Sequence, residues 1–408
     1  MTRPGSHASE PLDGGAALDL EQVRKDTPAV EHQSFLHSAG SSLMPKPVVE
    51  AMIDHIRLEE RVGGYAAADQ MQAQLDGVYA SVAGLLNAAP DEIALVENAT
   101  VAWQMAFYAL PWKSGDRVLT TQAEYAANYV AYLQMARRRG VIVEVVPNDT
   151  SGALDLEALR RMIDERTRLV SITWIPTNGG LVNPGALVGR IARAAGVPFL
   201  LDACQAVGQM PVDVRAIGCD MLAGTGRKFL RGPRGTGFLY VRRDLLLSLE
   251  PPMIDHFAAP WTSTSRYTLR PDARRFETWE NNYAGRLGLG AAVDYARAIG
   301  LGAIEDRCRR LADRLREGLG SLPQVALLDL GRDRSAIVSF SITGRAALDV
   351  VKAAADESIV IGASPPASTR LDSEARGLPV VLRASPHYFN TDADVDRLVH
   401  LAARVAGR

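Results

Sequence analysis

The stretch Val197-Pro-Phe-Leu-Leu-Asp202 is an apolar, strand-like run that ends on a carboxylate, and Ala203-Cys-Gln-Ala206 continues from it. A lysine follows in the glycine-rich turn Ala223-Gly-Thr-Gly-Arg-Lys-Phe229. Considered singly, Asp202 would be a strand-end cap and Lys228 a surface lysine. Their occurrence together, an acid at the end of a strand and an amine on a short turn, indicates a shared chemical role.

Similar strand-like runs lie on both sides of this stretch, from Pro47 to about Tyr283, and alternate with helical patterns. The helical patterns are long enough to connect parallel strands by crossovers. This alternation predicts an α/β fold with a mostly parallel sheet wrapped by helices. The predicted strands are residues 93–96, 117–121, 141–146, 168–174, 197–202 and 236–241, and the predicted helices include residues 128–139, 154–165 and 184–195.

The pattern changes after Asn282, where long helices replace the alternation and predict an appended α+β lobe. Its predicted helices are 283–299, 303–322, 346–356 and one from residue 392, and its predicted strands are 336–342 and 380–384. Residues 362–377 are rich in Ser, Pro and Ala and are predicted to form a loop. We expect a flexible tail of residues 1–18, a large domain of residues 46–283, and a small domain of residues 19–45 with 284–408.

The chain has 408 residues, 47% of them hydrophobic, and a formal net charge of −2. This balance gives no indication of binding to nucleic acid or to a membrane. The first residues lack the basic and apolar regions of a secretion signal, so we expect a cytoplasmic protein. The three cysteines form no Cys-x-x-Cys pair and the seven histidines show no ligand spacing, so we expect no metal site.

One amine and a fixed carboxylate are what pyridoxal 5'-phosphate requires of a protein. The coenzyme is an aldehyde that is held as a Schiff base by one lysine, for which we propose Lys228. Its ring nitrogen accepts electrons well only when it stays protonated beside a carboxylate, for which we propose Asp202. The pair therefore predicts a pyridoxal phosphate enzyme.

Three further positions suit the phosphate group of this cofactor. A helical pattern opens at Ala99 and Thr100, where backbone amides and the helix dipole favour an anion. This motif taken alone favours an ordinary helix cap at Thr100 over a phosphate contact. Thr225 and Arg227, which flank the lysine turn, offer a hydroxyl and a guanidinium to the same oxygens.

Three other side chains suit the ring and the substrate. Tyr125 could lay its aromatic face on the cofactor ring, although a plain core tyrosine is about as compatible with its context. Gln205 could donate an amide hydrogen bond to the ring oxygen, or simply begin a helix. Arg383 ends an apolar run, and its guanidinium matches an amino-acid carboxylate, whereas an isolated arginine there is usually solvated.

From about Phe35 to its end, the chain resembles the class V aminotransferase and cysteine desulfurase family of fold type I pyridoxal phosphate enzymes. The resemblance is carried by Phe35-Leu-His-Ser-Ala-Gly40, Asp202-Ala-Cys-Gln205, Gly226-Arg-Lys228 and Arg383-Ala-Ser-Pro-His-Tyr-Phe-Asn390. It implies a large domain with a mostly parallel, seven-stranded sheet and a small α+β domain. It also implies a homodimer with active sites at the interface.

The resemblance implies a role for each matched residue. Lys228 would form the Schiff base, and Arg383 would bind the substrate carboxylate near His37 and Gly40. In the stretch Phe276-Glu-Thr-Trp-Glu-Asn-Asn282, where the family commonly has a Thr-rich turn for the partner's phosphate, Asn281 or Asn282 would substitute. The implied cofactor contacts are Ala99, Thr100, Tyr125, Asp202, Gln205, Thr225, Arg227 and Lys228.

One departure from the family concerns sulfur. Cysteine desulfurases carry a nucleophilic cysteine before the carboxylate-binding strand, but this chain has Gly362-Ala-Ser-Pro-Pro-Ala-Ser-Thr-Arg370 there. Because a hydroxyl cannot store a persulfide, ordinary desulfurase action is disfavoured.

With Gly63-Gly-Tyr-Ala66, the chain is most similar to a subgroup of isopenicillin N epimerase-like proteins and C-S lyases of natural-product pathways. This similarity favours β-elimination from a cysteine S-conjugate, giving a thiol, pyruvate and ammonia. The alternatives are decarboxylation coupled to oxidative deamination, epimerisation or transamination, and a cofactor-binding scaffold without activity.

Overall fold

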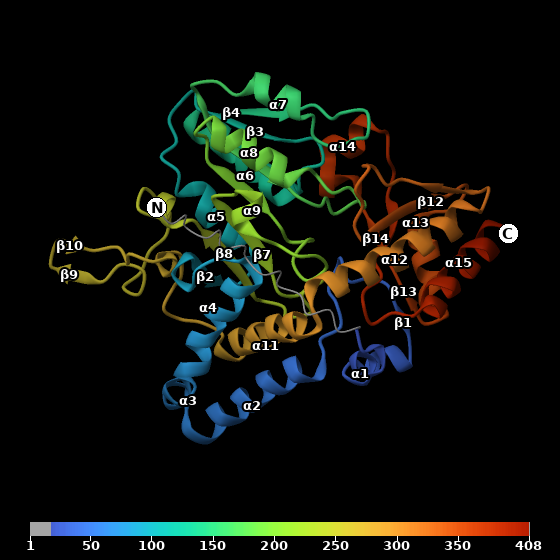
Figure 1. Ribbon diagram of the computed structural model, residues 1–408, viewed down its shortest axis with the longest axis horizontal. Coiled ribbons are helices and arrows are strands. Elements are labelled where there is room, and N and C mark those ends of the chain that lie inside the picture. Colours follow the sequence, from blue (N-terminus) through green and yellow to red (C-terminus); the bar gives the residue numbers. More distant parts are fainter. Residues whose placement is uncertain (1–17, 408) are drawn as a thin grey trace, which may run out of the picture.

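The computed structural model describes residues 18–407, so the predicted tail, apart from Leu18, lies outside the described residues. A seven-stranded sheet in the order β2-β8-β7-β6-β5-β3-β4 occupies the centre (Figure 1). Strand β8 runs opposite to the other six strands, and all pairs that do not include β8 are parallel. This confirms the predicted mostly parallel sheet. The strands are β2 (Ile93–Val96), β3 (Arg117–Thr121), β4 (Ile142–Val146), β5 (Thr167–Thr173), β6 (Phe199–Asp202), β7 (Met221–Thr225) and β8 (Gly237–Val241).

The central sheet is covered by helices on both faces. Successive β3 residues point to opposite sides, so that Val118 and Leu119 belong to two separate buried hydrophobic clusters. Such two-sided burial explains why these strands appear as continuous apolar runs in the sequence. The helices of this part are α4 (Gln72–Leu86), α5 (Ala99–Tyr108), α6 (Ala126–Arg139), α7 (Leu156–Met162), α8 (Gly185–Ala194), α9 (Val214–Ile217), α10 (Arg243–Leu246) and the 3-10 turns η2 (Pro90–Glu92) and η3 (Ala273–Phe276).

Strand β7 was not among the six predicted strands. It precedes the lysine turn, and its sequence Met-Leu-Ala-Gly-Thr contains a glycine that weakens the strand pattern. The glycine is required because a Cβ at Gly224 would lie 2.3 Å from the ring of Phe238 on the adjacent β8. Close packing between strands therefore explains why the sequence pattern was weak here.

The C-terminal part contains an antiparallel sheet in the order β11-β12-β15-β14. The amino-terminal strand β1 (Ser34–Phe35) joins this part by pairing with β13 (Ile359–Val360). How the chain divides into two domains stays a prediction. The remaining elements are β11 (Val325–Leu327), β12 (Val338–Ile342), β14 (Gly362–Ser364), β15 (Val381–Ala384), α11 (Tyr283–Ile299), α12 (Leu301–Gly320), α13 (Ala347–Asp356) and α15 (Asp392–Ala406).

The prediction of a loop over residues 362–377 was wrong. This segment contains β14, a 3-10 turn η4 (Pro366–Thr369) and the short helix α14 (Arg370–Ala375). Pairing of β14 with β15 and burial of Ser364, Thr369 and Ser373 override the loop-like composition. We call residues 362–375 the β14–α14 segment.

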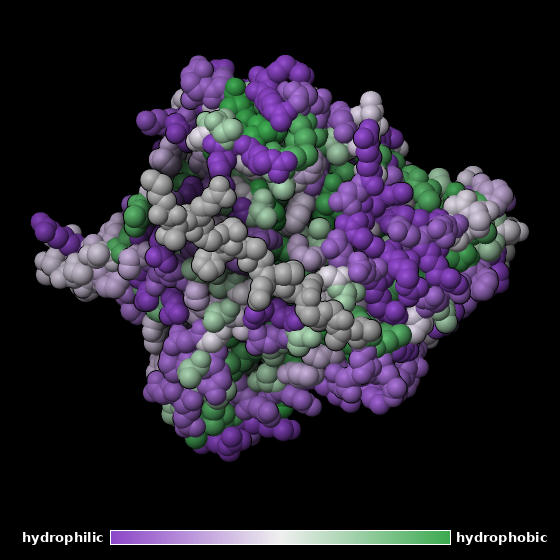
Figure 2. All heavy atoms as spheres, in the orientation of Figure 1, coloured by the Kyte–Doolittle hydropathy of each residue, from purple (hydrophilic) through white to green (hydrophobic). Residues whose placement is uncertain are grey.

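Several elements lie at the surface of the molecule. The hairpin of β9 (Trp261–Ser263) and β10 (Arg266–Tyr267) projects away from the body (Figure 1). The outer faces of α12 and α15 are mostly hydrophilic (Figure 2), and there Arg310 pairs with Asp392 and Arg314 with Asp396. The amino-terminal helices are α1 (Leu20–Lys25), η1 (Pro28–Glu31), α2 (Lys46–Val62) and α3 (Gly64–Gln70).

Among residues 18–407, no single helix is both long and apolar enough to cross a membrane. Helices α11 and α12 meet that test only as a pair, bent by 81°, and only by length and composition.

Candidate active site

The predicted cofactor residues gather at the carboxyl ends of the central strands. Thr173 pairs with Asp202 across β5 and β6, and Asp202 pairs with Ala223 across β6 and β7. The last residue of β7, Thr225, lies opposite Gly237, which in turn lies opposite Val96 at the end of β2. Because parallel strands end at one edge of a sheet, residues distant in sequence meet there.

The amine of Lys228 faces the ring of Tyr125, with Nζ 5.9 Å from the ring centre. Lys228 is buried, and burial lowers the pKa of its amine. A backbone hydrogen bond stabilises the turn that carries Lys228, because the amide of Arg231 donates to the Lys228 carbonyl at 3.0 Å. Arg231 is itself fully buried, with φ 61°, and donates to the hydroxyls of Thr27 and Tyr388.

The carboxylate of Asp202 is fixed by two hydrogen bonds. Oδ1 accepts from the amide of Cys204, and Oδ2 accepts from Nδ2 of Asn128, both at 3.0 Å. Asn128 was predicted to open a helix, but α6 begins two residues earlier at Ala126, which places Asn128 on the first buried turn. Its Nδ2 also donates to Oε1 of Glu124 at 3.0 Å, so that a second buried carboxylate adjoins the first.

The predicted phosphate contacts lie near one another. Ala99 opens α5, whose end is capped by Asn98, and Thr100 is exposed. A Cβ at Gly237 would lie 2.6 Å from the carbonyl carbon of Asn98, so β8 passes against this helix end. Since Thr225 is paired with Gly237, its side chain shares this corner of the molecule, where it donates to the Thr236 carbonyl at 3.3 Å.

Arg227 connects the lysine turn to the amino-terminal segment. Its guanidinium donates to the carbonyl of Gly40, and its own carbonyl accepts from the amide of Ser42 at 2.8 Å. The structure therefore brings Arg227 and Gly40 together, although the sequence separates them widely.

Arg383 lies on β15 and points toward the loop that follows β5. Its Nη1 donates to the carbonyl and the hydroxyl of Thr177 at 2.8 and 2.7 Å, whereas its Nε is buried without a partner. Burial first, and the charge of Arg227 second, lower the pKa of Arg383 to about 10. The guanidinium is therefore still charged at neutral pH and retains donors for a carboxylate.

Gln205 lies between the amino-terminal segment and Thr177. Its Nε2 donates to the Ala39 carbonyl at 3.2 Å and lies 3.5 Å from the Thr177 hydroxyl, and its Oε1 is buried without a partner. The predicted donation from Gln205 to a ring oxygen would thus require its amide to release one of these contacts. That role stays a prediction.

The ring of His37 lies between two glycines. A Cβ at Gly40 would lie 2.4 Å from His37 Nε2, and one at Gly362 would lie 2.2 Å from His37 Cε1. Burial first, and the charge of Arg383 second, lower the pKa of His37 to about 4. The imidazole is consequently neutral near pH 7, and its Nδ1 is buried without a hydrogen-bond partner.

Asn281 and Asn282 lie at the start of α11, beside a small cavity that Glu97 and Gly237 also line. The Oδ1 of Asn282 caps α11 by accepting from the Gly285 amide at 2.7 Å. Asn281 donates to the Thr278 carbonyl and accepts from Arg286, both at 2.6 Å. Both side chains are engaged within their own chain, and contact with a second subunit stays a prediction.

Four residues near the site were missed in the sequence. Glu124 precedes Tyr125, and Asn128 was noted only as a helix start. Thr177 and Asn178 follow β5, where Thr177 contacts Arg383 and Asn178 accepts a hydrogen bond from Ser364. The sequence could have predicted these residues, because polar residues just beyond the carboxyl ends of parallel strands are typical of ligand sites.

These residues fit pyridoxal 5'-phosphate. A buried lysine faces an aromatic ring, a fixed carboxylate lies at the neighbouring strand end, and Thr225 is paired with Gly237, which packs against the amino-terminus of α5. Buried polar atoms without partners remain on Gln205 and Arg383, as expected where a polar ligand supplies the missing contacts.

Comparison with known proteins agrees with this geometry. Residues 34–398 match the family described as aminotransferase class-V. A probable cysteine desulfurase of Methanothermobacter thermautotrophicus is 33% identical, over 96% of this chain and 99% of that protein. A cysteine desulfurase of Yersinia pestis is also 33% identical, over 93% and 96%.

Solved structures agree as well. The apo cysteine desulfurase of Thermococcus onnurineus has a TM-score of 0.89 and 29% identity, over 96% of this chain and 99% of that one. The cysteine desulfurase CsdA of Escherichia coli has a TM-score of 0.89 and 26% identity, with the same coverage.

Proposed function

Since this chain belongs to the aminotransferase class-V family and uses pyridoxal 5'-phosphate, we propose that it is a C-S β-lyase acting on a cysteine S-conjugate. Its relatives named above are cysteine desulfurases or a probable cysteine desulfurase, and cysteine is the amino acid from which a cysteine S-conjugate derives. The observation that carries the proposal is the β14–α14 segment, which has no cysteine.

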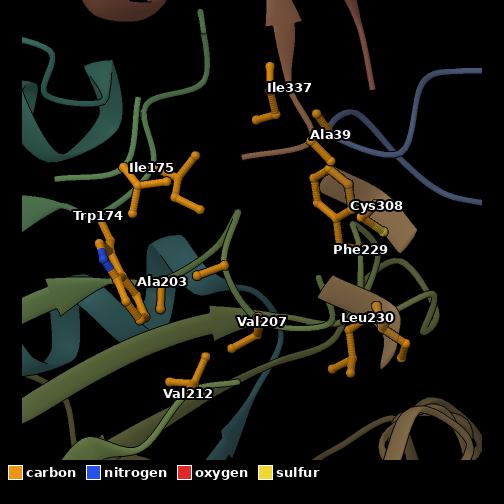
Figure 3. Close-up of a cluster of buried hydrophobic side chains, with 14 of the residues drawn as sticks. Ala39, Trp174, Ile175, Ala203, Val207, Val212, Phe229, Leu230, Cys308 and Ile337 are labelled. Carbon is orange, nitrogen blue, oxygen red and sulfur yellow. The ribbon is translucent and has the colours of Figure 1, made fainter. Parts of the chain in front are cut away.

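None of the three thiols of the chain suits a persulfide carrier. Cys219 and Cys308 are buried, and burial raises the pKa of both thiols. Figure 3 shows Cys308 among hydrophobic side chains, close to Phe229. Burial first, and the Asp202 carboxylate second, raise the pKa of Cys204 as well. Because the thiolate is the nucleophile, sulfur is better expelled with its substituent than transferred to the protein.

In the proposed reaction, Arg383 binds the substrate carboxylate through donors that Thr177 leaves free. His37 beside it is neutral at pH 7, so the charge that attracts the carboxylate is that of Arg383. When bound, pyridoxal phosphate holds the substrate nitrogen and withdraws electrons from Cα. Asp202 keeps the proton on the ring nitrogen, and Lys228, whose pKa burial lowers, removes the Cα proton.

The overall reaction balances without an oxidant. The Cβ–S bond breaks and sulfur leaves with the electron pair as a thiolate, which takes up a proton. The remaining three-carbon fragment adds one water and releases ammonia, giving pyruvate. The Lys228 amine, which lies 5.9 Å from the centre of the Tyr125 ring, supports the proposal that Lys228 exchanges these protons.

We further propose a cytoplasmic homodimer in which Asn281 or Asn282 of the partner subunit completes the phosphate site, and a role in sulfur metabolism or natural-product biosynthesis. The exposed aromatic residues Tyr65 and Trp279, whose ring centres lie 5.8 Å apart near Asn281, support a contact surface there.

The test is product analysis by mass spectrometry with the holoenzyme, a panel of cysteine S-conjugates and free L-cysteine, with and without oxygen. We expect equal amounts of thiol, pyruvate and ammonia, independent of oxygen. Alanine and sulfur from free L-cysteine would overturn the proposal in favour of desulfuration. Carbon dioxide with an oxygen-dependent aldehyde would overturn it in favour of oxidative deamination.

A further inference from the structure

A second buried carboxylate, Glu124, lies behind Asp202 on the loop between β3 and α6. Its Oε1 accepts from the Tyr125 amide at 2.8 Å, from Asn128 at 3.0 Å and from the Thr173 hydroxyl. Its Oε2 accepts from the Thr120 hydroxyl at 2.7 Å. Glu124 is only 3% exposed, so these protein donors stand where water would otherwise solvate the group.

Asn128 joins the two carboxylates through a single nitrogen. Its Nδ2 carries two N–H bonds, of which one reaches Asp202 and the other reaches Glu124, each at 3.0 Å. Both donors are used, so the amide cannot turn over without placing its oxygen against two carboxylates. We call Glu124, Asn128 and Asp202 the carboxylate network.

The network has an electrostatic consequence. Burial is the largest influence on the pKa of Glu124 and raises it, and the like charge of Asp202 raises it further, whereas three side-chain hydrogen bonds lower it and no cation is among the main influences. Two buried acids that share one amide are stabilised when a positive charge comes to lie against them. A protonated pyridine ring, set against Asp202, is such a charge.

We propose that Glu124 and Asn128 are positioning residues that act through Asp202 to hold the proton on the ring nitrogen of bound pyridoxal phosphate. This inference rests on the role proposed above for Asp202. Glu124 does not touch the cofactor in this arrangement. It fixes the amide of Asn128 and adds a second acidic group behind the first.

The substitution Glu124→Gln isolates this effect, because a glutamine can keep most of the hydrogen bonds. Its oxygen can occupy the Oε1 position and accept from Tyr125 and Asn128. Its nitrogen can occupy the Oε2 position and donate to Thr120, whose hydroxyl can turn to accept. Asn128→Leu breaks the connection at similar volume. Thr121→Val, at a buried β3 hydroxyl without a partner among the described residues, is the matched control.

The measurement is the ¹⁵N chemical shift of holoenzyme loaded with ring-labelled pyridoxal phosphate at neutral pH, together with the rate of cofactor loss on dialysis. We expect the wild type and Thr121→Val to give a protonated ring nitrogen. Glu124→Gln and Asn128→Leu should shift the signal toward the unprotonated value and speed cofactor loss about tenfold each. The double variant should lose the cofactor little faster than either single variant, because both act along one route.

The outcomes separate this inference from the proposed site. If Asp202→Asn moves the ¹⁵N signal but Glu124→Gln and Asn128→Leu do not, the role of the network is refuted and that of Asp202 stands. If Asp202→Asn leaves the signal unchanged, both fail. Should Glu124→Gln not fold, a wild-type signal in Asn128→Leu refutes the inference by itself.

Discussion

The carboxylate network and the side of the site that faces the substrate differ in how their polar atoms are used. In the network, Asn128 donates both of its side-chain N–H groups, one to Glu124 and one to Asp202. On the other side, His37 and Arg383 each keep a buried polar atom without a partner in the described chain. We call these two residues the substrate side.

This difference in hydrogen bonding indicates that the two regions control different properties of the enzyme, namely the state of the cofactor and the affinity for the substrate. A network whose donors are already occupied is rigid, which suits a cofactor that must be held in one electronic state. Unpartnered buried atoms are costly unless a ligand supplies their contacts, which suits groups that await a substrate. We therefore expect changes in the network to alter the cofactor, and changes on the substrate side to alter the affinity for amino acids.

The largest expected effect comes from Lys228→Ala. This substitution removes the lysine that holds the cofactor covalently and leaves the carboxylate network and the substrate side unchanged. Activity should fall more than about a thousandfold, since the proton-transfer amine is lost as well. The absorbance at about 420 nm should disappear, while the cofactor still binds non-covalently through the carboxylate network. Lys352→Ala, at an exposed lysine of α13, should change neither. Retention of the 420 nm band in Lys228→Ala would show that another amine holds the cofactor.

A smaller effect is expected from Arg383→Lys, which affects only the substrate side. An ammonium cannot form two parallel hydrogen bonds with a carboxylate and still hold Thr177, so kcat/KM should fall about a hundredfold. The cofactor absorbance should stay as in the wild type. Arg190→Lys, at an exposed arginine of α8, is the control. If the cofactor spectrum changes together with kcat/KM, the substrate side and the carboxylate network are coupled. The proposed division between substrate affinity and cofactor state would then be wrong.

Most of the fold could be predicted because the central strands other than the edge strand β4 are buried along most of their length and form mainly apolar runs between helices. The predictions failed where tertiary contacts decide the structure. Gly224 weakens the pattern of β7, yet packing against Phe238 demands it. The β14–α14 segment has the composition of a loop but is ordered by its pairing with β15 and by the contact of Ser364 with Asn178.

The site was predictable where one residue type has one chemical use. A lysine on a turn and an aspartate at a strand end predicted the cofactor when taken together and with the motifs around them, although neither residue would have done so alone. Glu124 and Thr177 were missed because acids and hydroxyls are common beyond strand ends, and only the register of β3, β5 and β6 brings them to the same place. The unpartnered atoms of the substrate side are likewise properties of packing, which no spacing in the sequence reveals.

The smallest expected effect concerns His37 and the pH dependence of stability. Its pKa is about 4 in the folded protein, below the ordinary value of 6.5. Between these values the unfolded chain binds a proton that the folded chain does not, so the stability from a neutral His37 is present above pH 6.5 and is lost as the pH falls toward 4. At pH 5 the loss should be about 1–2 kcal/mol, since the ring is not fully buried.

The substitution His37→Gln removes this titration while leaving a polar side chain between Gly40 and Gly362. Urea unfolding at pH 7 and pH 5 should show a smaller loss of stability on acidification in His37→Gln than in the wild type. His256→Gln, at an exposed histidine, should lose as much as the wild type. Equal losses in all three proteins would mean that His37 is free to take up a proton in the folded state. The substrate side would then carry a second cation beside Arg383, and its affinity for carboxylates should rise below pH 6, which the neutral imidazole forbids.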